Sequence, residues 1–176
     1  GGGGGRTKAE GVIHPDGSVE IRCGTQDVGV GTKTVIAQIA AEEFGLTLDD
    51  IIVKIGDTNS PPSGGSGGST TCASVSPAVK NTVQMARLKL FDTFASSTFG
   101  VSPHDLEAKD GKVYVKSDPS KSMTWQQAAA QLGDEPLVVQ GQWVPGLSSS
   151  GVPAVQFIEV EGNTATGVVK VVRVVA

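Results

Sequence analysis

The fold is decided by the stretch GTQDVGVGTKTVIAQIAAEEFG, which runs from Gly24 to Gly45. From Thr32 to Phe44 the apolar residues recur at helical spacing, and the next residue is a glycine, the type that most often ends a helix. The glycines before Thr32 let the backbone approach a ligand closely, and a helix start offers free N–H groups to an anion. The stretch therefore predicts a glycine-rich loop that leads into an amphipathic helix.

Strands and a second helix are predicted on either side of this stretch. Residues 9–13 and 18–23 flank a Pro-Asp-Gly turn, which is typical of a β-hairpin. Residues 51–55 form a nearly continuous apolar run and predict another strand. A second helix is expected from Pro77 to Phe94, because proline suits a first helical turn and apolar residues follow at helical spacing.

The remaining elements complete the order of the chain and so indicate its fold class. They are a short helical turn that Ser102-Pro103 caps and that ends near Glu107, a strand at 112–116, a helix that Thr124 caps and that runs to Leu132, and strands at 137–144, 154–161 and 168–175. Helices and strands are mixed, with antiparallel hairpins at both ends. This order predicts an α+β fold, a two-layer mixed/antiparallel sheet with helices on one face, rather than a doubly wound parallel sheet.

Composition excludes several classes of protein. The chain has 176 residues, of which 38% are hydrophobic and 18% charged, a balance that suits one globular domain. Its net charge is -4 and it has no run of Lys and Arg, so we expect neither nucleic acid nor a membrane as its partner. No apolar stretch is long enough to cross a bilayer. Two cysteines are too few for a disulfide framework or a zinc site, and we expect no metal ligands in the chain.

Both ends of the chain predict a piece of a longer protein. It opens on a glycine run without an initiator Met and closes on the apolar run 168–176. A natural domain seldom ends inside a strand that needs a neighbour. We expect residues 1–8 to be a flexible glycine-rich start and residues 9–176 to form one partial domain.

The first loop has the spacing of two nucleotide-binding motifs but fits neither. Gly24 and Gly29 are spaced as in a P-loop, but Val30-Gly31 stands where that motif needs Lys followed by Ser or Thr. The Rossmann fingerprint needs a third glycine where this chain has Thr34. On this loop alone, a phosphate site and an ordinary turn between a strand and a helix are equally open.

A second glycine-rich loop, SGGSGGSTTCASVS at residues 63–76, runs into the second helix. Its backbone and hydroxyl groups can cradle the oxygen-rich atoms of a cofactor. The structural alternative is that Ser74 or Ser76 simply caps the helix. Two such loops in one small chain favour a ligand site over two ordinary turns.

Several motifs, in the order of the chain, resemble the molybdenum-cofactor-binding large subunits of the xanthine dehydrogenase/aldehyde oxidoreductase family. The two glycine-rich loops are similar to that family's two cofactor loops. The Thr-Gln-Asp and Gly-Gly-Ser-Thr-Thr segments are most similar to bacterial periplasmic-type aldehyde oxidoreductases, which use the cytosine dinucleotide form of molybdopterin. Other segments that resemble the family are the helix at 37–46, the Gly-Asp-Thr at 56–58 and the late hairpin at 155–160 and 166–171. The match is weakest from about Val101 to Val144.

The resemblance implies a partial fold of the molybdenum-cofactor-binding-domain type, which holds molybdopterin with molybdenum, in the cytosine dinucleotide form. Many members have Gln between the two glycines where this chain has Val30, so contact there must come from the backbone N–H groups of Val30, Gly31 and Thr32. The cofactor-binding residues that the resemblance implies are Gln26, Gly29, Val30, Gly31, Thr32, Thr70, Thr71, Cys72, Ala73, Ser74, Val75 and Ser76.

The resemblance also implies a function. Enzymes of this family are molybdenum hydroxylases that oxidise aldehydes or N-heteroaromatics with water as the oxygen source, and their general base is a glutamate outside the matched region. We therefore expect no catalytic residue here and no activity of the chain alone. Glu42 and Glu43 are expected to face solvent, and Cys72 to be a packed, unreactive thiol in a loop. The implied partners are the rest of the large subunit, iron–sulfur and flavin subunits and a small aldehyde or heteroaromatic substrate, in the bacterial periplasm or cytoplasm.

Two other hypotheses use the same loops. In the first, the chain is a free-standing nucleotide/phosphate-binding module without catalysis, and the isolated chain would then have a measurable affinity for a nucleotide. In the second, the chain is a structural piece whose loops bind nothing.

Overall fold

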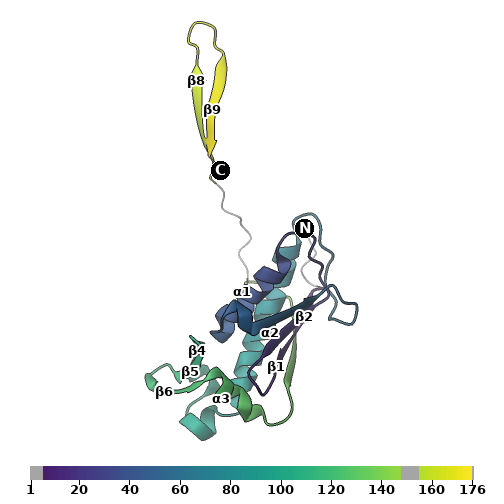
Figure 1. Cartoon of the computed structure of the whole chain (residues 1–176), viewed down its shortest axis with the longest axis vertical. Helices are drawn as coiled ribbons and strands as arrows, with labels where there is room; N and C mark the ends of the chain where they lie inside the picture. Colours follow the sequence, from purple (N-terminus) through teal and green to yellow (C-terminus); the bar gives the residue numbers. More distant parts are fainter. Residues whose placement is uncertain (1–5, 148–154, 176) are drawn as a thin grey trace.

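A mixed sheet and two long helices form the body of the protein (Figure 1). The computed structural model describes residues 6–147 and 155–175. The helices are α1 (Thr32–Phe44), α2 (Thr71–Asp92) and α3 (Trp125–Ala129), with short helical turns at Leu48–Asp50, Ala95–Phe99, Pro103–Asp105 and Ala130–Leu132. The strands are β1 (Lys8–Ile13), β2 (Val19–Cys23), β3 (Ile51–Ile55), β4 (Leu106–Lys109), β5 (Lys112–Val115), β6 (Asp118–Thr124), β7 (Leu137–Gln142), β8 (Phe157–Gly162) and β9 (Val169–Val175).

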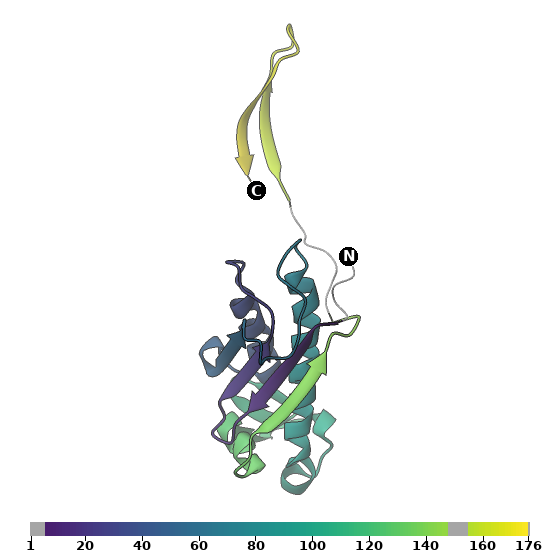
Figure 2. The same ribbon diagram turned by 90° about the vertical axis from the view of Figure 1, so that its right-hand side faces the viewer.

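The main sheet has the strand order β3-β2-β1-β7, and the long helices cover one of its faces (Figure 2). β2 and β3 are parallel, whereas the other neighbours are antiparallel. Two glycines on the covered face let α2 lie close to the sheet. A Cβ added to Gly141 would lie 2.9 Å from the Cα of Thr82, and one added to Gly11 would lie 3.3 Å from the Cγ2 of Thr82. The predicted α+β fold, with a mixed sheet and helices on one face, is confirmed.

The core continues from the main sheet to a small second sheet of order β4-β5-β6. Phe44 at the end of α1 packs on Trp125 of α3, with ring centroids 5.2 Å apart, and the Trp125 indole N–H donates to the Gly17 carbonyl at 2.8 Å. Gly45 ends α1 in the left-handed conformation, with φ 63°, as predicted. A Cβ there would lie 2.4 Å from the Lys109 backbone, so this glycine also admits β4.

The second helix begins earlier than predicted. It starts at Thr71, and Pro77 lies inside it rather than in its first turn. A proline has no N–H to donate to the carbonyl four residues before it, which here belongs to Ala73. The indole N–H of Trp143 donates to that carbonyl at 3.2 Å, so the helix continues past the proline. The prediction that Cys72 lies in a loop was therefore wrong, because Cys72 is in the first turn of α2.

The other elements agree with the prediction in type, although two strands were missed. The first hairpin, the helical turn capped by Ser102, the helix capped by Thr124 and the late hairpin are confirmed, except that residue 154 lies outside the described residues. β4 is only four residues long and alternates buried Leu106 and Ala108 with exposed residues, which is too short a pattern to predict a strand, and β6 is mostly polar and exposed. Most of the expected flexible start, residues 1–5, lies outside the described residues, whereas Thr7 is buried and Lys8 already begins β1.

The late hairpin of β8 and β9 stands apart from the body in Figure 1, and all of its described residues are exposed. Cross-strand pairs place Ile158 opposite Val174 and Val160 opposite Val171, on one face. The opposite face carries charges, because Glu159 is paired with Arg173 and Glu161 with Lys170. The hairpin is therefore amphipathic. Within the described ranges, no helix combines the length and the apolar character that a membrane span requires.

Candidate functional site

The two glycine-rich loops meet at one end of the main sheet, above the starts of α1 and α2 (Figure 2). Ser66 joins them, because its N–H donates to the Gln26 side-chain oxygen at 3.2 Å and its hydroxyl donates to the Gln26 carbonyl at 2.5 Å. At the base of the loops, the Gly24 N–H donates to the Pro61 carbonyl at 2.8 Å. A Cβ on Gly24 would lie 2.8 Å from that oxygen, so the close approach requires glycine.

A pocket of about 470 Å³ lies between the two loops. Its first-loop side is apolar, because the exposed residues Val28 and Val30 line it together with Val35 of α1. Its second-loop side is built from small and hydroxyl-bearing residues. The full lining is Val28, Val30, Thr32, Val35, Ser66, Gly67, Gly68, Ser69, Thr71, Cys72, Val75 and Ser76. The pocket thus combines an apolar wall with a polar one.

The start of α1 is occupied by the carboxylate of Asp27. One of its oxygens accepts the N–H groups of Gly29, Val30 and Gly31 at 3.0, 3.0 and 3.2 Å, and the other accepts the Lys33 N–H at 3.3 Å. These hydrogen bonds, that from Lys33 foremost, lower the pKa of the Asp27 carboxyl below its ordinary value. The amides that we expected to be free for an external anion are therefore already bound by an internal one, except that of Thr32.

At the start of α2, by contrast, no side chain caps the backbone N–H groups. Its N-cap residue, Thr70, donates its hydroxyl to the Gly67 carbonyl at 2.8 Å and makes no side-chain bond to the helix. The first amide of the helix with a partner is that of Ser74, which donates to the Thr70 carbonyl at 3.0 Å. Among the described residues, the N–H groups of Thr71, Cys72 and Ala73 have no acceptor. Such amides carry the partial positive charge of a helix N-terminus.

The residues predicted for cofactor binding fall into three groups. Those that line the pocket are Val30, Thr32, Thr71, Cys72, Val75 and Ser76. Those that shape the loops around it are Gln26, Gly29, Gly31 and Thr70. Neither Ala73 nor Ser74 lines the pocket, and the buried Ser74 hydroxyl donates to the Thr71 carbonyl at 3.0 Å.

Neither serine that might have capped the second helix does so. Ser74 and Ser76 both lie inside α2, so that structural alternative was wrong. The exposed thiol of Cys72 lies 3.3 Å from the Ser76 hydroxyl and borders the pocket, so the prediction that it is packed was wrong. Asp27 was not predicted as a site residue, although an aspartate shortly before a helix is a recognised capping signal.

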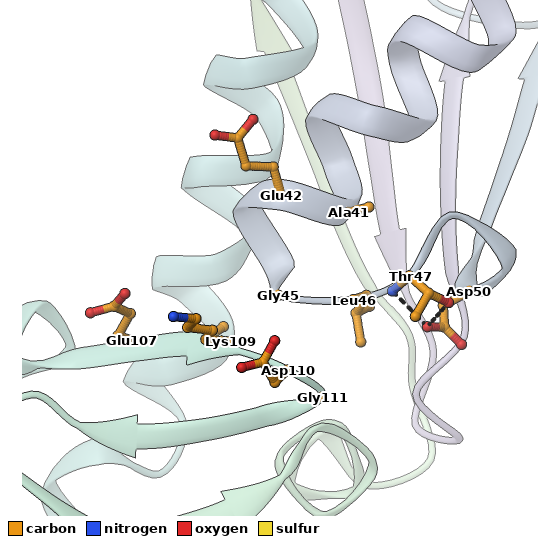
Figure 3. Close-up of a pocket in the computed structure, with 11 residues that line it drawn as sticks. Ala41, Glu42, Gly45, Leu46, Thr47, Asp50, Glu107, Lys109, Asp110 and Gly111 are labelled. Atoms are coloured by element: carbon orange, nitrogen blue, oxygen red, sulfur yellow. Dashed lines mark hydrogen bonds between the residues drawn. The ribbon is translucent and has the colours of Figure 1, made fainter.

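A second hollow, of about 650 Å³, lies between the end of α1 and the turn joining β4 and β5 (Figure 3). The charged residues that line it are four carboxylates and one lysine: Glu42, Asp50, Glu107, Asp110 and Lys109. Thr47 also lines it and donates its hydroxyl to Asp50. An anionic ligand is repelled by this excess of negative charge. The uncharged pocket between the loops is therefore the better site for an anionic ligand.

The carboxylates of α1 are not both solvent-facing. Glu42 is exposed, as predicted, but Glu43 forms salt bridges with Arg87 at 3.0 Å and with Lys80 at 3.5 Å, and accepts a hydrogen bond from Gln84. Glu43 therefore ties α1 to α2, and the prediction of a solvent-facing side chain was wrong for it. In residues 6–147 and 155–175, no three His, Cys, Asp or Glu side chains gather as metal ligands would.

The loop pocket fits an anionic ring-containing cofactor. Gly67 and Gly68 border open space, since a Cβ on either would meet nothing within 4 Å, and a ligand can therefore approach the backbone there. The valines offer flat apolar surface, and the first amides of α2 offer donors. At the base of the first loop, the buried Thr25 hydroxyl also has no partner among the described residues. Buried hydroxyls are normally paired.

Comparison with known proteins agrees with this geometry. A family model described as "Molybdopterin cofactor-binding domain" matches residues 3–176. The aldehyde oxidoreductase molybdenum-binding subunit PaoC of Escherichia coli (strain K12) is 31% identical over 166 residues, which are 93% of this chain and 21% of that subunit. The carbon monoxide dehydrogenase large chain of Afipia carboxidovorans is 35% identical over 122 residues, which are 69% of this chain and 15% of that one.

Solved structures give the same result. The reconstituted CO dehydrogenase from Oligotropha carboxidovorans superimposes with a TM-score of 0.71 at 28% identity, over 96% of this chain and 22% of that one. Quinoline 2-oxidoreductase from Pseudomonas putida 86 shares the fold, with a TM-score of 0.72 at 20% identity. The matches to the PaoC subunits cover most of this chain but only about a fifth of the length of those relatives. It belongs to the molybdopterin cofactor-binding domain family of the molybdenum hydroxylases, which includes the large subunits of aldehyde oxidoreductase and CO dehydrogenase.

Proposed function

We propose that this chain is the cofactor-binding segment of a molybdenum hydroxylase that oxidises aldehydes or N-heteroaromatics with water as the oxygen source. The observation that carries the proposal is the meeting of the two glycine-rich loops across one uncharged pocket, with the Gln26–Ser66 hydrogen bonds holding them together. When bound, molybdopterin with its molybdenum supplies the oxidation chemistry. The residues of this chain bind and orient it.

The two sides of the pocket have different roles in this proposal. Val28, Val30 and Val35 pack against the flat ring system and keep water from that side. On the other side, the hydroxyl of Ser69 and the first amides of α2 bind the anionic tail. We propose the cytosine dinucleotide form of the cofactor, which the resemblance of both loops to periplasmic-type aldehyde oxidoreductases supports.

The chain contributes no general acid or base in this proposal. The lining of the pocket includes no Asp, Glu or His, and Glu43 is held in salt bridges. The catalytic glutamate therefore belongs to another part of the large subunit, and the chain alone is inactive.

The proposed partners are the rest of the large subunit and, through it, iron–sulfur and flavin subunits. The amphipathic hairpin of β8 and β9 supports the first of these. Its apolar face, which includes Ile158, Val160, Val171 and Val174, is exposed, and an isolated two-stranded hairpin is at best marginally stable in water. We propose that polypeptide from the rest of the subunit covers this face.

A pair of glycine variants in a full-length large subunit tests the proposal. Gly67 lines the pocket and Gly65 does not, yet both lack positive φ angles and have open space around an added Cβ. Gly67→Val should fill the pocket without straining the backbone, whereas Gly65→Val serves as a matched control. We expect Gly67→Val to lose most of its bound molybdenum and extractable pterin, and Gly65→Val to retain both. Equal molybdenum contents in the two variants would reject the proposed site.

Nucleotide binding by the isolated chain distinguishes the proposed function from the alternative, a free-standing nucleotide-binding module. A free-standing nucleotide-binding module would bind CTP or ATP in calorimetry without the rest of the subunit. We expect no measurable heat of binding. The start of α2 offers backbone N–H groups to the phosphates, but the lining of the pocket includes no cationic side chain. The dinucleotide form is tested by hydrolysing the cofactor extracted from the full-length subunit and assaying the released nucleotide. The cytosine dinucleotide form should release CMP.

A further inference from the structure

The second glycine-rich loop is held firmly at its base. The Gly24 N–H, just after β2, donates to the Pro61 carbonyl at 2.8 Å, and the Lys8 N–H, at the start of β1, donates to the Pro62 carbonyl at 2.9 Å. Two neighbouring strands of the main sheet therefore fix the point from which the loop rises.

The middle of this loop, residues 65–69, is held much less firmly, and we call it the strap. A Cβ added to Gly65, Gly67 or Gly68 would meet nothing within 4 Å, so these residues pack against nothing. Glycines also allow the backbone to change conformation at little cost. At the end of the strap, Ser69 has a φ of 57°, a left-handed conformation that a residue with a side chain seldom adopts. The strap is therefore built to move on a fixed base.

Ser66 holds the strap against the first loop. Its N–H donates to the Gln26 side-chain oxygen at 3.2 Å, and its hydroxyl donates to the Gln26 carbonyl at 2.5 Å. The Gln26 side chain is itself oriented, because its amide donates to the Gly24 carbonyl at 3.3 Å. Among the described residues, no other residue of the strap forms a hydrogen bond with a part of the chain outside the second loop. One serine therefore decides whether the strap lies against the first loop.

The strap is also a wall of the loop pocket. Residues 66–69 line the pocket from the second loop, whereas Val28 and Val30 line it from the first loop. The hydrogen bonds between Ser66 and Gln26 keep these two walls together. If the strap moves away from the first loop, the pocket widens on that side.

We propose that Ser66 is a positioning residue and that its hydrogen bonds with Gln26 act as a clasp. When closed, the clasp sets the width of the pocket, and its release lets the strap move aside and admit a ligand. The identity of that ligand rests on the proposed function, but the clasp does not. Its test uses thiol reagents and needs no cofactor, so that either proposal can fail without the other.

Cys72 can report the opening of the strap. It lines the pocket with an exposed thiol, whereas Cys23, the other cysteine of the chain, is buried. The full 176-residue chain is treated either with fluorescein maleimide, which is bulky, or with N-ethylmaleimide, which is small, and modification of Cys72 is followed by mass spectrometry. Ser66→Ala should react with the bulky reagent roughly two- to tenfold faster, the range that the loss of one hydrogen bond allows. The small reagent should react at nearly the same rate in both chains, because it reaches the exposed thiol while the clasp is closed.

Two further variants distinguish the clasp from a general structural role. Ser66→Thr keeps the hydroxyl and should react like the unaltered chain. Ser120→Ala is the matched control, because the Ser120 hydroxyl donates to Asp118 at 2.6 Å in β6, which does not line the pocket. Ser66→Ala should also keep the urea midpoint of the unaltered chain, since the strap lies outside the hydrophobic core. A serine with a purely structural role would lower that midpoint and would not distinguish the two reagents.

Three outcomes would overturn the proposal. The first is a Ser66→Ala chain that reacts with fluorescein maleimide no faster than Ser120→Ala. The second is an equal acceleration with both reagents, and the third is a Ser66→Thr chain that reacts as fast as Ser66→Ala. If Ser66→Ala lowers the urea midpoint, Gln26→Ala decides, because it removes the acceptor of the Ser66 N–H. An unchanged rate with the bulky reagent then counts against the proposal.

Discussion

The close approach of α2 to the main sheet makes Gly141 a position where a substitution should cost stability. A Cβ on Gly141 would lie 2.5 Å from the Oγ1 of Thr82 and 2.9 Å from both its Cα and its N. A rotamer change can relieve the first contact but not the other two, which involve helix backbone. Gly141→Ala must therefore move α2 away from β7 or distort the strand.

The expected cost can be worked out from these contacts. Overpacking a core by one methyl group typically costs about 1–3 kcal/mol, and a contact with rigid backbone belongs at the upper end, about 3 kcal/mol. Gly11→Ala is the matched control, since its Cβ would lie 3.3 Å from the Cγ2 of the same Thr82. That methyl group can shift slightly, and alanine is favoured over glycine in a strand by about 0.5–1 kcal/mol. The net effect of Gly11→Ala should be below about 1 kcal/mol.

Urea unfolding and thermal unfolding of the full chain, each followed by circular dichroism, measure both variants. The predicted fall of about 3 kcal/mol in the free energy of unfolding for Gly141→Ala corresponds to a fall in Tm of roughly 6–12 °C for a domain of this size. Adding Thr82→Ala should restore only part of the stability, because the contacts with the Thr82 backbone remain and the Thr82 hydroxyl bond to the Ala78 carbonyl, at 2.7 Å, is lost. The reasoning fails if Gly141→Ala is no less stable than Gly11→Ala, or if Thr82→Ala restores the stability completely.

Three further predictions concern α2, the first loop and the hairpin. Trp143→Phe removes the hydrogen bond to the Ala73 carbonyl and should lower the free energy of unfolding by about 0.5–1.5 kcal/mol, measured by urea unfolding. Because the pKa of Asp27 is lowered in the folded chain, the stability that its carboxylate gives is complete above the ordinary pKa of an aspartate and is lost as the pH falls through the lowered value. The protection of the Lys33 amide against exchange, relative to its intrinsic rate at each pH, should fall over that acid range in the unaltered chain, and Asp27→Asn should not show this pH dependence. A chain that ends at Leu147 should unfold at the same urea concentration as the full chain, within error, since the described residues of β8 and β9 are all exposed; a lower midpoint would show that the hairpin stabilises the body.

The parts of the fold that could be predicted are those with a local cause. α1 was predicted at its observed bounds, because its apolar spacing and Gly45 are contained in one short segment. The start of α2 was missed because proline usually marks a first turn, and the group that compensates for Pro77 is Trp143, far along the chain. β6 depends on pairing with β5 rather than on an apolar pattern of its own, and the alternation in β4 covers only four residues.

The candidate site shows the same division. Both loops could be located from their glycines and from the helices that follow them, and the structure places them on one pocket. The partner of the first-loop amides could not be found from spacing alone, since Asp27 reaches them only when Gly29 and Gly31 adopt left-handed conformations. The sequence predicted which segments meet, but the direction of their hydrogen bonds depends on backbone conformation.

Val30 and Asp27 are best understood together. In many members of the family a glutamine between the two glycines offers a side-chain amide, and Val30 cannot do so. The backbone amides of the same loop do not replace that donor, because three of them are bound to one oxygen of Asp27. The first loop therefore offers a ligand mainly apolar surface from Val28 and Val30, and under the proposed function we expect the hydrogen bonds to the ligand to come from the second loop and α2. A Val30→Gln variant should thus add a donor to the pocket without disturbing the Asp27 cap, since the Val30 side chain is 65% exposed and only its backbone takes part in the cap.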